Sequence, residues 1–499
     1  MIFSYFYHVL DTKKNSEQTV TIPRQEYEKL KFELEQLKRM LFGKKSERFV
    51  PSSTNQLNIF SPEIPPEEQE PAEKYTVTYQ REKKKSKKKQ AIRTEISSHL
   101  PRVEEIIEPE NIVEGSVKIG EEITELLEIT PATIFVRRII RPKYALPKEQ
   151  GIIIAELPSL PIPKGNAGAS LLAFIAVSKF EDHLPLYRIR KIFKRQELDV
   201  SPSTISGWSG KTADLLLPLY DELKENFLQD ANYLQSDESP IKVQDKNKKK
   251  ALHQGYMWAY RNPIKRLVLF EYNKGRGLQA PLEFLKNFKG TLQTDGYNVY
   301  QALVKANPNI TLLGCMAHAR RYFEKALDND PRRAEHVLLL IQKLYSMERK
   351  AKERNSSIEV IKRYRLIYAL PIIQEIELYL KQEINLVLPK STIGVAMAYT
   401  LKIYGNLKQY LYDGRYEIDN NMIENSIRPL AIGRKNYLFA GSHQAAQHYA
   451  MFYSFFATCK INNVNPFEWL NDVIRRIPEH KANKLHLLLP GNWSKANYE

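Results

Sequence analysis

Residues 419–436 of this 499-residue chain read DNNMIENSIRPLAIGRKN. Ile423, Ile427 and Leu430 recur at spacings of four and then three residues, which places them on one face of a helix. Glu424 lies beside that apolar face. The pattern therefore predicts a helix that packs on a core and carries an acidic side chain at the edge of the contact.

Proline limits how far this helix is expected to run. Pro429 has no backbone N–H and its ring crowds the preceding turn, so we expect the helix to end or kink just before it. Residues 433–436, GRKN, then read as a basic turn. A lone glutamate on a helix is usually solvated, so the meaning of Glu424 depends on two upstream segments.

Both upstream segments combine strand character with an aspartate. Residues 233–243 read YLQSDESPIKV, and a short strand-like run in them leads into Asp237. Residues 290–300 read GTLQTDGYNVY, and a strand-like run again leads into Asp295. Between them are two β-rich runs separated by a turn signal, and then a helical stretch at 278–287. The order is a strand with Asp, a hairpin, a helix, a strand with Asp, and a later helix with Glu.

An RNase H-like fold places three carboxylates on a metal site in this order. Cleaving or joining a phosphodiester needs an activated oxygen nucleophile and a stabilised leaving oxyanion. Two Mg²⁺ ions about 4 Å apart supply both, and such hard cations take carboxylate oxygens as ligands. We therefore expect Asp237, Asp295 and Glu424 to be catalytic residues that bind two Mg²⁺ or Mn²⁺ ions.

Several motifs together resemble bacterial DDE transposases, and most specifically the insertion-sequence-66 family. They are DESP at 237–240, DGY at 295–297, CMAHARR at 315–321, the block at 420–442, and LFGKKSER at 41–48. The resemblance covers most of the chain. It implies metal-dependent DNA cleavage at the ends of a mobile element and transfer of the 3′-OH into target DNA. The family's Glu-Arg pair is Glu424-Asn425 here, so Arg428 is the candidate replacement for the missing arginine.

Two alternatives remain open. The first is a non-catalytic DNA-binding protein derived from a transposase. The second is an RNase H-like nuclease that hydrolyses DNA without joining strands.

Composition favours a polyanionic partner. The chain has 75 Lys and Arg against 58 Asp and Glu, a net charge of +17, and phosphate neutralisation dominates nucleic-acid affinity. The two cysteines exclude a disulfide framework. No apolar run is long enough to span a membrane, and residues 1–10 lack the features of a signal peptide. These features fit a reducing cytoplasm, and the resemblance implies a bacterial, nucleoid-associated protein.

The N-terminal third divides into three predicted segments. Residues 1–49 carry a short heptad pattern that predicts a helix or brief coiled coil. Residues 50–93 are rich in proline and charge, which predicts a disordered linker. Residues 94–165 predict a small β module. The resemblance implies paired zinc-binding cysteines in this module, but none is present, so no zinc is expected.

Residues 166–228 predict a helical region that resembles a helix-turn-helix. Ser201-Pro202 predicts a helix start, with serine as the N-cap and proline at the first position. In a helix-turn-helix the second helix reads the major groove, so Ser203, Thr204 and Lys211 are candidate DNA contacts. Plain helical packing is nearly as consistent with the pattern.

The remaining chain predicts a catalytic core interrupted by helices. We expect core segments at 229–323 and 412–465, an all-α insertion at 324–411 for DNA-end binding or dimer contact, and a C-terminal tail at 466–499. The resulting fold class is multidomain α+β with an RNase H-like core. Candidate contacts to DNA phosphates are His318, Arg320, Arg321, Arg428, Arg434 and Lys435.

The resemblance also implies partners. These are the element's terminal inverted repeats and target DNA, a homodimer or larger synaptic assembly, and two small accessory proteins of the same element.

Overall fold

The computed structural model describes residues 134–137, 139–140, 143–145, 152–154, 159–163, 165–245 and 252–494. The chain divides into two compact units, Met1–Gly43 with Ile139–Glu499 and Lys44–Arg138, and the fold below belongs to the first. The helix predicted at 1–49 and the linker predicted at 50–93 lie outside the described residues. Of the predicted β module, a hairpin is described in which β1 (Lys143–Ala145) pairs antiparallel with β2 (Ile152–Ile154).

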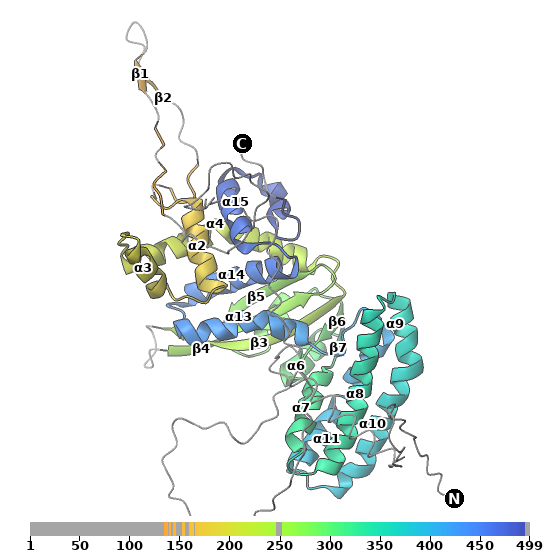
Figure 1. The fold of residues 1–499 in the computed structure, drawn as a ribbon. Helices are drawn as coiled ribbons and strands as arrows, with labels where there is room; N and C mark the ends of the chain where they lie inside the picture. The colour runs from red at the N-terminus through yellow and green to blue at the C-terminus, as the bar shows by residue number, and fades with distance from the viewer. Residues whose placement is uncertain are drawn as a thin grey trace, which may run out of the picture. The chain divides into compact units, whose positions relative to one another are not determined.

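A five-stranded mixed sheet forms the centre of this unit (Figure 1). Its order is β5-β4-β3-β6-β7. The strands are β3 (Tyr233–Gln244), β4 (Leu252–Asn262), β5 (Leu267–Asn273), β6 (Gly290–Gln293) and β7 (Ile310–Leu313). The pairs β3–β4 and β4–β5 are antiparallel, whereas β6 runs parallel to β3 and β7 runs parallel to β6.

Glycine permits the close approach of β6 to β3. Gly290 has a φ of +148°, and a Cβ at this position would lie 2.3 Å from the carbonyl oxygen of Asn232. A side chain would therefore clash with the backbone, whereas glycine lets Thr291 N–H donate to that same carbonyl at 2.9 Å. This contact sets the register of the parallel pair.

Helix α14 (His443–Ile461) covers the edge strand β5, as its apolar sequence predicts. Ser454 Oγ accepts from the Phe270 N–H at 2.8 Å, and Thr458 Oγ1 accepts from the Val268 N–H at 3.1 Å. An edge strand otherwise presents unpaired N–H groups that invite pairing with another chain. Hydroxyl groups on the covering helix satisfy two of them here.

Three helices precede the sheet in the sequence and pack against one another, and the first and third of them also pack against α14. They are α2 (Ala169–Phe180), α3 (Leu186–Arg195) and α4 (Pro202–Leu228). Phe180 stacks on Phe452 of α14 with ring centroids 4.8 Å apart. The predicted helix start is confirmed, because Ser201 is the N-cap of α4 and its side chain accepts from the Thr204 N–H at 3.1 Å.

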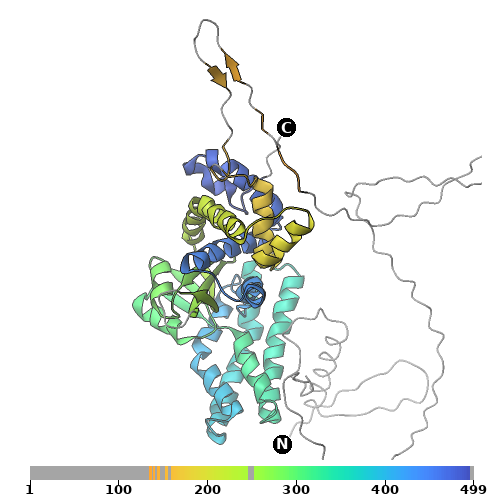
Figure 2. The same ribbon diagram turned by 90° about the vertical axis from the view of Figure 1, so that its left-hand side faces the viewer.

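Residues 316–412 form a helical region with its own apolar core. In both views these helices gather in one bundle beside the sheet (Figure 1; Figure 2). The elements are α7 (Met316–Ala326), α8 (Pro331–Glu353), α9 (Ile358–Tyr364), a π-helical turn (Arg365–Ala369), α10 (Leu370–Glu383), α11 (Thr392–Lys402) and α12 (Tyr404–Lys408), with 3₁₀ turns at Ile384–Leu386 and Gln409–Tyr412.

Four described helices remain, together with two 3₁₀ turns near the C-terminus. They are α5 (Gln279–Phe284), α6 (Asn298–Ala306), α13 (Asn421–Tyr437) and α15 (Pro466–Arg476), with 3₁₀ turns at Ile477–Glu479 and Ala482–Leu488. Among the described residues, no helix is both long and apolar enough to cross a bilayer.

Pro429 was expected to end or kink its helix, and the structure contradicts the first of these outcomes. Helix α13 continues through Pro429 to Tyr437, so the predicted basic turn at 433–436 is helical. The ring removes one helical hydrogen bond, but Ile423, Ile427 and Leu430 are all buried in the sheet core. Because most helical stability in proteins comes from packing of the apolar face, this burial outweighs the local cost.

A strained turn follows this helix. Leu438 has φ 65° and ψ −44°, and the Phe439 N–H donates to the Tyr437 carbonyl at 2.8 Å, which is a rare form of γ-turn. We expect Leu438→Gly to raise the free energy of unfolding by roughly 0.5–1 kcal/mol, because glycine adopts positive φ without strain. Leu438 is 62% exposed, so little packing is lost.

Urea unfolding measures this effect, with Leu438→Ala as the matched control. Alanine shortens the side chain but keeps the Cβ that causes the strain. An equal gain from both substitutions would show that the effect comes from the exposed side chain and not from the backbone.

Candidate active site

Parallel pairing of β3 and β6 brings Asp237 and Asp295 to the same region. Gln235 lies opposite Gln293 in this pair, and each aspartate is two residues further along its chain. Asp237 Oδ1 accepts from the Glu238 N–H at 2.8 Å. Asp295 Oδ1 accepts from the Tyr297 N–H at 2.9 Å. Both carboxylates are half-buried.

The backbone around Asp295 is held from the helical region. Gly296 has a φ of +88°, and a Cβ there would lie 3.1 Å from the Tyr399 hydroxyl. That hydroxyl on α11 donates to the Asp295 carbonyl at 2.6 Å. The glycine of the Asp-Gly-Tyr motif therefore allows both the turn and the approach of α11.

Glu424 enters from the first turn of α13. Its helix is tethered to β4, because Arg261 Nη1 lies 3.3 Å from the Met422 carbonyl oxygen. The Glu424 carboxylate faces α7, with Arg321 Nη2 at 3.4 Å and His318 Nδ1 at 3.9 Å. Packing of α13 thus places the Glu424 carboxylate beside α7, the helix that follows β7.

The three acidic residues influence one another electrostatically. Burial raises the pKa of Asp237 well above its ordinary value, and the charges of Glu238, Asp295 and Glu424 add to the rise. Burial and the Arg321 cation lower the pKa of His318, while Glu424 and Asp295 act in the opposite direction. Asp237, Asp295, Glu424 and His318 therefore share one electrostatic neighbourhood.

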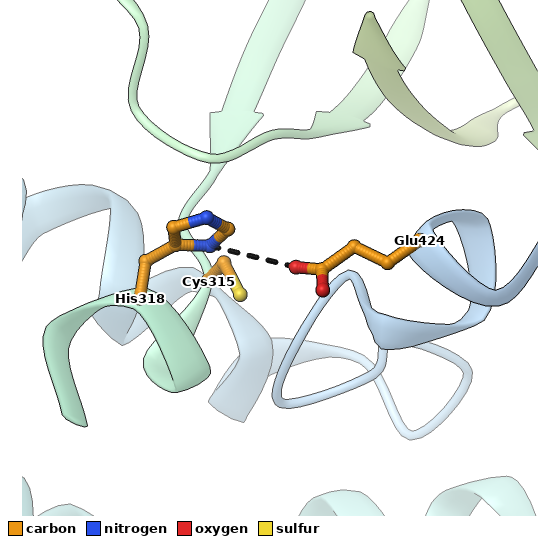
Figure 3. Close-up of side chains that lie close together, drawn as sticks. All are labelled: Cys315, His318 and Glu424. Atoms are coloured by element: carbon orange, nitrogen blue, oxygen red, sulfur yellow. Dashed lines mark ion pairs between the residues drawn. The ribbon is translucent and has the colours of Figure 1, made fainter. Parts of the chain in front are cut away.

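Only one group of side chains in the described structure has three ligand atoms within 4.8 Å of one another. It consists of Cys315, His318 and Glu424 (Figure 3). The three acids Asp237, Asp295 and Glu424 do not form such a group. In Figure 3 His318 and Cys315 come from the start of α7 and face Glu424 across a short gap.

The thiol of Cys315 is poorly suited to bind a metal ion in this state. It is buried, burial raises its pKa, and its sulfur accepts from the Asn420 N–H at 3.4 Å. A metal-binding cysteine must lose its proton. Cys315 therefore serves the fold by satisfying a backbone donor at the start of α13.

Glu238 is a site residue that sequence reasoning missed. Its side chain is 1% exposed, Arg276 Nε donates to it at 2.8 Å, and the Tyr300 hydroxyl donates to it at 3.1 Å. Burial raises its pKa, and the Arg276 hydrogen bond acts in the opposite direction. No short-range signal identifies this role, because strand alternation turns Glu238 away from its neighbour Asp237 and its partner Arg276 lies 38 positions away.

The candidate DNA-contacting residues fall into two regions. His318, Arg320, Arg321, Arg428, Arg434 and Lys435 lie on α7 and α13, whereas Ser203, Thr204 and Lys211 lie on α4. Arg320 pairs with Glu324 at 3.0 Å, and Arg434 Nη1 donates to Ser239 Oγ at 2.7 Å. Arg434 therefore contributes to holding α13 on β3.

Polar atoms without hydrogen-bond partners gather near the start of α13. Within the described residues they include Asn420 Oδ1 and Nδ2, Asn421 Oδ1, His318 Nδ1 and Gln235 Oε1, all with almost no exposed surface. Unsatisfied polar atoms in such places are costly unless water or an ion completes them. Water or an ion bound among these residues would satisfy them.

Replacing Asp237 with asparagine is expected to stabilise the protein at pH 7 without divalent cations. Because folding raises the pKa of Asp237, stability is lost as pH rises from the ordinary carboxylate value through the raised one. Asparagine carries no charge, so the gain is on the order of 1 kcal/mol near pH 7 and vanishes below about pH 4. Urea unfolding with a chelator at both pH values measures it.

Asp221→Asn is the control for this substitution, because Asp221 is 62% exposed. It should change stability by less than about 0.5 kcal/mol at either pH. A gain from Asp237→Asn that is the same at pH 4 and pH 7 would rule out charge repulsion as its cause.

Three family models match the sequence. One described as the transposase IS66 family matches residues 164–448. One described as the IS66 C-terminal element matches residues 454–490. One described as the homeodomain of transposase C of IS166 matches residues 29–104, which lie outside the described structure. The first model includes all the site residues discussed above.

Similar proteins occur in Sinorhizobium fredii. Protein y4jD is 33% identical over 80% of this chain and 81% of its own length. Protein y4qI is 32% identical over 80% of this chain and 76% of its own length. Protein y4hP is 28% identical over 94% of this chain and 89% of its own length. All three are named as uncharacterized proteins.

Proposed function

This chain belongs to the IS66 transposase family, and we propose that it cuts DNA at the ends of its mobile element and joins the freed 3′-OH to target DNA. The observation that carries the proposal is the parallel register of β3 and β6, which brings Asp237 and Asp295 to the same region, together with the placement of Glu424 on the first turn of α13. Asp237 lies on β3, Asp295 follows β6 by two residues, and Glu424 lies on α13, which packs on β3 and β4.

The strand order supports an RNase H-like core. Three consecutive strands, β3, β4 and β5, form an antiparallel meander, and β6 and β7 extend the sheet parallel to β3 on its other side. The aspartates are placed on the central strand and just after its parallel neighbour. A helix that follows the sheet in sequence, α13, supplies the glutamate.

The carboxylate donors fit a hard divalent cation such as Mg²⁺ or Mn²⁺. Asp237 has other carboxylates as its strongest charged neighbours, and a cation would relieve that repulsion. Glu424 contacts Arg321 and His318 in this structure, so ion binding with the aspartates requires Glu424 to change partners. When bound, two such ions activate the attacking oxygen and stabilise the leaving oxygen.

The chain's other site residues would orient the DNA. Arg321 has a side chain that is 45% exposed and lies beside Glu424, so its guanidinium can bind a backbone phosphate once Glu424 moves. Burial lowers the pKa of His318, which favours its neutral form. It can therefore position a phosphate through a hydrogen bond without adding fixed charge.

DNA binding outside the site is assigned to α3 and α4. Together they line a cavity of about 180 Å³ whose walls include Tyr187, Arg190, Lys191 and Lys194. Ser203, Thr204 and Lys211 are exposed on α4. We propose that this helix-turn-helix-like pair binds the element ends, and that the match at 29–104 adds a second DNA-binding region.

The same proposal includes the assembly. Joining two element ends requires them to be held together, so a homodimer or larger synaptic complex is expected, with two accessory proteins as further partners. The working compartment would be the bacterial cytoplasm, at the nucleoid.

Incubation of the full-length protein with DNA carrying an element end, a target plasmid and Mg²⁺ tests the function. Recombinant products in which the end is joined to the plasmid support a transposase. Cleavage without joining would replace the proposal with a nuclease. Binding without any strand scission would replace it with a non-catalytic DNA-binding protein.

A further inference from the structure

Two buried glutamines lie opposite each other on the strands that lead to the aspartates. Gln235 and Gln293 are both 0% exposed and are partners in the parallel β3–β6 register. Gln235 Nε2 donates to Gln293 Oε1 at 2.8 Å. The Tyr233 hydroxyl donates to the same oxygen at 2.6 Å. Strand interiors normally carry apolar residues at such positions. The free-energy cost of burying two amides here must therefore be offset by hydrogen bonds to a further partner.

That partner is the chain segment that leads into α13, residues 416–420, called the approach segment here. Gln293 Nε2 donates to the Glu417 carbonyl at 2.8 Å, and Gln235 Nε2 lies 3.4 Å from the Asp419 carbonyl oxygen. The Glu417 N–H donates to the Tyr233 hydroxyl at 3.1 Å. The sheet therefore binds the backbone of the approach segment through the side chains of Tyr233, Gln235 and Gln293. Each glutamine lies two residues before an aspartate of the site.

The opposite side of the approach segment is bound to the helical region. The Met316 N–H donates to the Ile418 carbonyl at 3.1 Å, and the Tyr345 hydroxyl donates to Asp419 Oδ2 at 2.8 Å. Asp419 Oδ1 in turn accepts from the Asn421 N–H at 3.0 Å. The segment is thus clamped between the sheet and α7–α8, and Glu424 follows it by one helical turn.

We propose that Gln235 and Gln293 are positioning residues that set the place of Glu424 relative to Asp237 and Asp295. This inference rests on the proposed function of the three acids. Within the described structure, the hydrogen bonds of the two glutamine side chains go to each other, to Tyr233 and to backbone carbonyls, and none of these bonds goes to the carboxylates of the three acids. The glutamines act by tying the start of α13 to the same two strands that carry the aspartates, so that all three acids move with one sheet.

Replacing Gln293 with methionine tests this role, because methionine has a similar length and no hydrogen-bonding amide. Asn307→Leu is the matched control. Asn307 is 7% exposed, and its Nδ2 donates to the carbonyls of Leu285 at 3.1 Å and Phe288 at 3.2 Å. It is a buried amide that satisfies backbone carbonyls of the same core, but it does not contact the approach segment.

Two readouts separate positioning from a general loss of stability. Hydrogen exchange of the full-length protein without metal should become at least about tenfold faster at the amides of 417–424 in Gln293→Met, and unchanged there in Asn307→Leu. In the strand-transfer assay, kcat should fall by about 10- to 100-fold in Gln293→Met, because small misplacements of catalytic groups cost this much. The KM for DNA should stay within about twofold.

Unchanged exchange at 417–424, or a kcat loss equal to that of Asn307→Leu, would overturn the inference. If Gln293→Met does not fold, Gln235→Met is measured in its place, with the same expected direction. A wild-type protein that neither cleaves nor joins DNA would overturn the proposed function. The exchange experiment would still decide whether the glutamines hold the start of α13.

Discussion

Asp237→Asn, Asp295→Asn and Glu424→Gln are each expected to reduce strand cleavage and joining by about a thousand-fold or more. Each substitution keeps the size of the side chain but removes the charge that binds a divalent cation, and such preorganised charge supplies the largest share of many rate enhancements. Asp237→Asn is the most informative of the three, because it is also expected to stabilise the fold.

Binding of end-containing DNA should be retained by all three variants, since the expected DNA-binding helices α3 and α4 are left unchanged. Cleavage assays on labelled DNA, together with a gel-shift measurement, separate chemistry from binding. Glu377→Gln is a suitable control, because Glu377 pairs with Lys381 on the surface of α10 at 2.7 Å and lies outside the site. Retention of more than about a third of the activity by any one amide variant would remove that residue from the machinery.

Loss of the Arg365 guanidinium is expected to have the largest effect on stability. Arg365 is 2% exposed. It donates to Glu348 through Nε at 2.8 Å and Nη2 at 2.7 Å. It also donates to the carbonyls of Tyr410 at 2.9 Å, Asp413 at 2.8 Å and Tyr416 at 2.9 Å. An arginine has five N–H donors, and these five bonds use them all.

Arg365→Met would leave the Glu348 carboxylate buried without its cation and three carbonyls without donors. We expect a loss of about 3–5 kcal/mol in the free energy of unfolding. Glu348→Met together with Arg365→Met should recover part of this, because the double variant removes the uncompensated charge but still leaves the carbonyls unsatisfied.

Urea unfolding monitored by hydrogen exchange in the helical region measures both variants. Lys381→Met is the control, because it breaks only the ion pair between Lys381 and Glu377, which lie one helical turn apart. It should lower the free energy of unfolding by at most about 0.5 kcal/mol. A cost for Arg365→Met as small as that of the control would mean that Glu348 and the carbonyls find other partners. Because Arg365 binds the Asp413 carbonyl just before the approach segment and the Tyr416 carbonyl at its start, its loss should also speed exchange at 417–424.

Local patterns predicted most of the elements that carry the site. The period of Ile423, Ile427 and Leu430 predicted α13, and the Ser201-Pro202 pair predicted the start of α4. Strand-like runs before Asp237 and Asp295 predicted the first part of β3 and the whole of β6, although β3 continues past Asp237 to Gln244. These predictions succeed because periodicity and capping depend on residues within a few positions of each other.

The failures occurred where packing overrides a local rule. Pro429 breaks an isolated helix, yet α13 continues past it because its apolar face is buried against the sheet. Glu238 reads as an ordinary acidic neighbour of Asp237, and its partner Arg276 is 38 positions away. Neither outcome can be read from a short window of sequence.

The amino-acid sequence by itself determined the family and most of the elements that bear the three expected acids, because family motifs and hydrophobic periods are short-range properties. Tertiary structure alone decided which side chains meet. It paired Glu424 with Arg321 and His318, and it joined Gln235 and Gln293 to the approach segment. The physical reason is that these contacts depend on strand register and on burial of polar groups between elements more than a hundred residues apart, which no local preference specifies.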